Sequence, residues 1–131
     1  MTPATIEVSK QVELGKIKVW FALKDLGAQG GTRDDIALIW SRLIIGRELA
    51  REYFTGDAAE YVGDALIVIK GLSNKLHQSK LTQTHASAGQ VEILRTGLQA
   101  MDEMITLTTA KERSDIRSTA AKAMERELAY A

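Results

Sequence analysis

The stretch that decides the fold is TRDDIALIWSRLIIGRELAREYF, residues 32–54. Its apolar residues recur every three or four positions, which is the period of an α-helix. One stripe consists of Ile36, Ile39, Trp40, Leu43, Ala50 and Phe54, and a second face carries Leu38, Ile45 and Leu49. Thr32 can cap this helix, and Asp34 and Asp35 complement the dipole of its first turn. The sequence therefore predicts a helix with more apolar surface than a single contact can cover.

Two further helices are predicted on either side of this stretch. The first begins at Pro3 after a Thr2 cap, because proline is tolerated at the first position of a helix, and it ends at Gly27. The next begins at Asp57, which stands three residues before Glu60 in the spacing of a capping box.

The second half of the chain continues in the same way. A polar stretch, residues 78–86, predicts a loop, and Ser87 with Gln90 predicts a capped fourth helix. Residues 112–131 are rich in Ala, Glu, Lys and Arg, so they favour a C-terminal helix that buries little and either protrudes or continues the fourth. No strand pattern occurs. We therefore predict an all-α fold, a bundle of four to five helices in a single domain over residues 1–131.

The composition excludes several classes of function. The chain has no cysteine, which rules out disulfides, thiolate metal sites and thiol catalysis. Lys+Arg and Asp+Glu both number 17, and a net charge of zero disfavours a general nucleic-acid binder. No apolar run approaches the ~20 residues that span a bilayer, and residues 1–10 lack the pattern of a signal peptide. We expect a cytoplasmic protein without a cofactor.

The second apolar stripes predict that these helices are packed on two sides, either by other helices of the bundle or by another chain. In the first helix this stripe includes Leu14, Ile17 and Phe21, and in the second it is Leu38, Ile45 and Leu49. Leaving these side chains in water would forfeit roughly 1.5–3 kcal/mol for each one and would invite aggregation. Either one helix threads the centre of the bundle, or a second copy packs on it. We favour a homodimer with helices that pack across the subunit interface, since symmetric dimers are the commonest oligomers.

Clustered carboxylates raise an enzymatic alternative. Residues 48–50, 56–57 and 63–68 resemble the metal-binding helical hairpin of MazG-type nucleoside triphosphate pyrophosphohydrolases. The resemblance implies an all-α dimer or tetramer that cleaves nucleotides with Mg²⁺, with Glu48 and Asp64 as metal ligands. Ile45 and Tyr61 stand where that family has its other two carboxylates, so half of the expected ligands are replaced.

A second alternative is a nucleic-acid-binding regulator. Lys70, Lys75 and Lys80 form a basic zone, with no acidic residue between Asp64 and Glu92. Lysines in such a zone could contact phosphates, although a lysine near a helix C-terminus also suits the dipole.

The sequence contains neither a phosphate-binding glycine loop nor a serine nucleophile motif. We therefore favour a small helical interaction or regulatory module that binds a protein partner, rather than an enzyme, with the C-terminal helix as the candidate contact.

Overall fold

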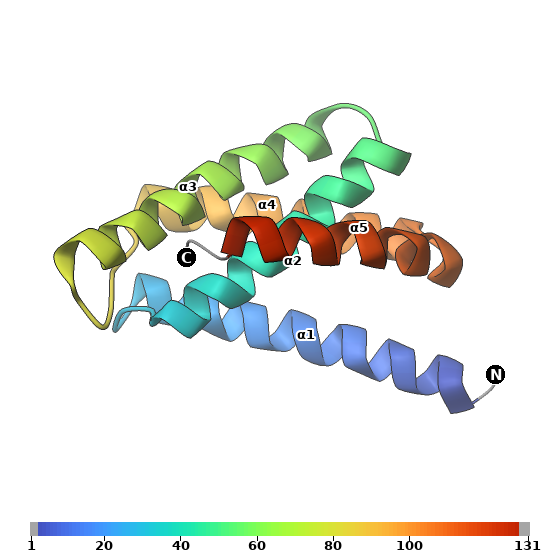
Figure 1. The fold of residues 1–131 in the computed structure, drawn as a ribbon, viewed down its shortest axis with the longest axis horizontal. Coiled ribbons are helices and arrows are strands. Elements are labelled where there is room, and N and C mark those ends of the chain that lie inside the picture. The colour runs from blue at the N-terminus through green and yellow to red at the C-terminus, as the bar shows by residue number, and fades with distance from the viewer. Residues whose placement is uncertain (1–2, 129–131) are drawn as a thin grey trace.

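The helix encoded by the deciding stretch lies at the centre of the molecule. A computed structural model describes residues 3–128, with side chains described from residue 15 onward, and consists there of five helices (Figure 1). These are α1 (Pro3–Gly27), α2 (Arg33–Tyr53), α3 (Asp57–Ser79), α4 (Ala88–Leu107) and α5 (Ala110–Leu128). The predicted all-α fold is confirmed for this part of the chain. None of these helices is long and apolar enough to cross a membrane.

Helix α2 is the central helix because it packs against each of the other four. In Figure 1 it runs obliquely through the middle, with α5 in front of it and α4 behind it. Its fully buried side chains come from both predicted faces, for example Ile39, Leu43 and Leu49. Threading through the bundle therefore covers most of both apolar stripes of this helix without a second chain, and Leu38 remains exposed.

Most of the predicted helix ends are confirmed. Thr32 and Asp35 form a reciprocal capping box at the start of α2, and Ser87 and Gln90 form another at the start of α4. The capping box predicted at Asp57 is wrong, because Gly56 occupies the cap position with a φ of 90° and no side chain caps α3. The predicted cap Thr2 lies outside the described residues.

Helices α4 and α5 are separate, and their break has a local cause. Thr108 ends α4 in an extended conformation, and Thr109 then exchanges two hydrogen bonds with Glu112, from Thr109 N to Glu112 Oε1 (2.8 Å) and from Glu112 N to Thr109 Oγ1 (3.1 Å). This reciprocal cap starts a new helix.

Helix α5 packs along α2 rather than protruding from the bundle. Its buried residues are Ile116, Ala120 and Ala123. The alternative of a protruding helix is therefore wrong for residues 110–128, whereas the helix buries few side chains, as expected. Residues 129–131 lie outside the described part.

Glycines within helices divide into two kinds. A methyl group at Gly97 would overlap Ala65 Cβ and lie 2.9 Å from the carbonyl oxygen of Tyr61, so Gly97 permits the close crossing of α3 and α4. A methyl group added at Gly63 or Gly71 would have no neighbouring atom within 4 Å. Packing therefore requires a glycine at position 97 but not at positions 63 and 71.

Candidate functional site

Glu48 is engaged by arginines within its own chain. Its side chain is 9% exposed, and its Oε1 accepts hydrogen bonds from Nε and Nη2 of Arg47, both at 3.1 Å, and from Nη1 of Arg51 at 3.2 Å. Two guanidinium groups thus compensate the negative charge of this buried carboxylate. The carboxylate implied as a metal ligand by the resemblance is therefore engaged by arginines of its own helix.

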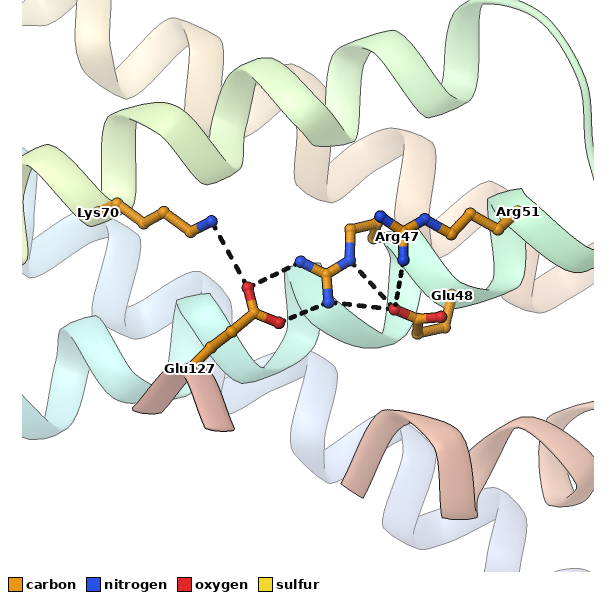
Figure 2. Close-up of polar contacts among 5 residues, drawn as sticks. All are labelled: Arg47, Glu48, Arg51, Lys70 and Glu127. Carbon is orange, nitrogen blue, oxygen red and sulfur yellow. Dashed lines mark hydrogen bonds and ion pairs between the residues drawn. The ribbon is translucent and has the colours of Figure 1, made fainter. Parts of the chain in front are cut away.

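The same arginine joins three helices through one carboxylate (Figure 2). Arg47 on α2 donates from Nη1 and Nη2 to the two oxygens of Glu127 on α5, at 2.8 and 2.5 Å. Lys70 on α3 lies 3.5 Å from Glu127 Oε1. The hydrogen bond with Arg47 lowers the pKa of Glu127, and the same bond raises the pKa of Arg47. This network fastens the C-terminal part of α5 to the bundle.

Asp64, the other predicted metal ligand, lies in different surroundings. It is exposed and lines a groove between α3 and α4, in which Tyr61 is also a lining residue. Among the described side chains, no group of three or more His, Asp or Glu could hold a metal ion. The structure therefore places Glu48 in an ion-pair network and Asp64 in a surface groove.

The predicted basic zone is divided among three environments. Lys70 is paired with Glu127, whereas Lys75 is exposed on the last turns of α3. Lys80 lines a hollow of about 430 Å³ between the start of α2 and the end of α3, together with Arg33 and others. The three lysines do not form one uncompensated patch, since the first is neutralised.

The residues predicted for a subunit interface also separate. Leu49 is fully buried and Ile45 is half-buried, and both line a cavity closed by α5. This part of the second stripe is therefore already covered within the chain. Leu38, Ile17 and Phe21 remain 40%, 49% and 61% exposed, and the side chain of Leu14 lies outside the described residues.

The exposed apolar residues of α1 belong to a surface that we name the α1 basic face, consisting of Lys16, Ile17, Trp20, Phe21 and Lys24. These side chains line a shallow hollow of about 350 Å³, and no carboxylate lines it among the described residues. Trp20 is held against α4, because its Nε1 donates a hydrogen bond to Asp102 at 3.0 Å. Asp102 also accepts a hydrogen bond from Arg42 at 3.1 Å. The face therefore combines apolar contact area with positive charge on an anchored helix.

A surface that carries two carboxylates lies between α3 and α4. We name it the α3–α4 acidic groove, which is lined by Tyr61, Asp64, Glu92, Ile93 and Thr96 and has a volume of about 230 Å³. Tyr61 and Ile93 are 43% and 41% exposed. Ile67, at 71% exposure, follows Asp64 by three residues and so extends the apolar surface along the same face of α3. Glu92 Oε2 accepts a hydrogen bond from Arg95 Nη1 at 2.6 Å, so one of the two carboxylates of the groove is paired within α4, and Asp64 supplies the other negative charge.

The sequence had indicated only part of these surfaces. It singled out Ile17 and Phe21 but not the lysines beside them, and it singled out Asp64 but not Tyr61 or Ile93 as exposed apolar residues.

Comparison with known proteins adds no further information, since no protein-family model, no curated protein and no solved structure matches the chain.

Proposed function

We propose that this protein is a helical interaction module that self-associates, with the α1 basic face of one copy docked in the α3–α4 acidic groove of a second copy. One observation carries this proposal. A single chain exposes two partly apolar surfaces with complementary charges. One carries Lys16 and Lys24, and the other carries Asp64 together with Glu92, which also pairs with Arg95.

Apolar burial would supply most of the affinity. Phe21 and Ile17 are the most exposed side chains of the α1 basic face, and burying what remains of each contributes about 1–2 kcal/mol. Lysine–carboxylate pairs at the rim of such a contact are worth roughly 0–1 kcal/mol each. Their larger effect is on orientation and on the choice of partner.

Symmetry decides how many copies assemble. In a two-fold dimer each copy offers its α1 basic face to the other copy's groove, so both pairs of surfaces are covered at once. If only one α1 basic face docked in one groove, the other face and the other groove would stay free. Further copies could then bind to them and form an open-ended assembly. We therefore propose a closed dimer, which also agrees with the homodimer favoured by the apolar stripes.

The experiment that tests this proposal is sedimentation velocity over a range of protein concentrations. We expect a dimer for the native chain and a dissociation constant at least tenfold higher for Phe21→Asp, because a carboxylate in an apolar contact loses hydration without compensation.

The matched control is Leu107→Asp, since Leu107 is 73% exposed and belongs to neither surface. This variant should sediment like the native protein. A native chain that stays monomeric, or equal dissociation by both variants, would contradict the proposal. A monomeric chain that still binds an acidic apolar protein through the α1 basic face would point to a different partner.

A further inference from the structure

The contact that holds α5 on the bundle is not fully packed. A cavity of about 160 Å³ lies between α2, α4 and α5, and we name it the α5 cavity. Apolar side chains from all three helices line it, among them Leu49, Met101 and Ile116. Its volume is close to that of an engineered apolar cavity of ~150 Å³ that accepts benzene.

Three arginines also line the α5 cavity, and no carboxylate does so among the described residues. Arg42 gives one Nη group to Asp102, but its Nε is buried and has no hydrogen-bond partner within the described part of the chain. Arg113 uses Nη1 for the carbonyl oxygens that end α4, of Ile105 (3.1 Å) and Thr108 (2.6 Å). Arg117 is exposed on α5.

These features define a ligand by its chemistry. An apolar body of about six to eight carbon atoms matches the volume and the aliphatic lining. A carboxylate on that body would meet guanidinium groups, which bind carboxylates through paired hydrogen bonds, and would supply an acceptor for the unpaired donor of Arg42. A hydrocarbon of the same shape would leave that donor unpaired, and a neutral hydroxyl group would pair with it more weakly than a charged carboxylate does.

We infer that the α5 cavity binds a small carboxylic acid with a compact apolar body, such as an aromatic acid of the size of benzoate. None of its lining residues belongs to the α1 basic face or to the α3–α4 acidic groove, so the inference does not rest on the proposed self-association. Because α5 forms one wall, a bound acid would stabilise the docked position of that helix.

The test uses benzoate as the probe and benzyl alcohol as its neutral counterpart. Two-dimensional NMR of the Met and Ile methyl groups should show saturable shifts at Met101 and Ile116 with benzoate. The affinity for benzyl alcohol should be at least tenfold weaker. Benzoate at ten times its dissociation constant should raise Tm by about 5 °C.

Arg117→Gln is the variant that separates binding from folding. Because Arg117 is exposed, we expect an unchanged Tm without ligand and at least a fivefold loss of benzoate affinity. Arg126→Gln, at another exposed arginine of α5 that does not line the cavity, is the control and should bind benzoate normally. Ala120→Leu, which fills the cavity, should prevent the methyl shifts.

Three results would overturn the inference. The first is the absence of saturable methyl shifts with benzoate in the native protein. The second is equal affinity for benzoate and benzyl alcohol, and the third is equal loss of affinity in the Arg117→Gln and Arg126→Gln variants, because the arginines would then play no part. None of these results decides whether the chain dimerises.

Discussion

The crossing of α3 and α4 makes a quantitative prediction about two glycines. Gly97 and Gly63 both lie inside helices, so replacing either with alanine gains about 1 kcal/mol of helix propensity. At Gly97 the new methyl group would overlap Ala65 Cβ and stand 2.9 Å from the backbone oxygen of Tyr61, and neither neighbour is the flexible end of a side chain. Forcing such a contact costs about 2–4 kcal/mol, at or above the usual range for overpacking. Gly63 has no such neighbour within 4 Å.

The two substitutions should therefore have opposite signs. Gly97→Ala should lower the free energy of unfolding by about 1–3 kcal/mol, and Gly63→Ala should raise it by up to about 1 kcal/mol. Urea unfolding followed by circular dichroism at 222 nm measures both. Adding Ala65→Gly to Gly97→Ala should recover part of the loss, because it removes the nearest obstructing atom. If Gly97→Ala stabilises the protein as much as Gly63→Ala does, the described crossing is wrong.

Three other predictions concern the charged residues. Glu127→Gln should lower the free energy of unfolding by about 1–2 kcal/mol, because it weakens the paired hydrogen bonds from Arg47. The folded-state pKa of Glu127 is lowered, so its contribution is present above the ordinary value of 4.5 and is lost as the pH falls through the folded value. Acid titration of unfolding should thus cost the native protein more stability than Glu127→Gln, and parallel curves would contradict this. Millimolar Mg²⁺ should leave Tm unchanged, since arginines already bind the carboxylate of Glu48. A clear rise in Tm would favour the pyrophosphohydrolase alternative. Mobility shifts with duplex DNA should be absent at about 150 mM salt, and a shift that Lys75→Gln with Lys80→Gln abolishes would favour nucleic-acid binding.

Local signals predicted the helices well. Thr32 and Ser87 cap helices as expected, because each has a side chain of the right kind three residues later and the interaction stays within one turn. Asp57 has the same spacing to Glu60 but lies one residue inside the helix, since Gly56 can adopt the positive φ that the turn requires. Which of two adjacent residues becomes the cap depends on the backbone conformation of the turn that precedes the helix.

The candidate site could be predicted only in part, because its contacts join residues that are far apart in the sequence. The pattern of α2 showed two apolar faces, but whether another helix or another chain covers them depends on where α5 docks. Glu48 lies in a network in which Arg47 also binds Glu127, 80 residues after Arg47 in the chain. No periodicity connects residues at that separation. The lysines of the α1 basic face were visible in the sequence, but their relation to Phe21 required the orientation of α1.

The most direct test of the proposed self-association reverses the charges of the two surfaces separately. Lys16→Glu with Lys24→Glu gives a chain whose α1 face and groove are both acidic, and Asp64→Lys with Glu92→Lys gives a chain in which both are basic. Each variant alone should be monomeric in sedimentation equilibrium. An equimolar mixture should form a dimer of twice the 14.4 kDa of one chain, because each α1 face then meets a groove of opposite charge. Variants that dimerise alone as the native chain does, or a mixture that stays monomeric, would contradict the account.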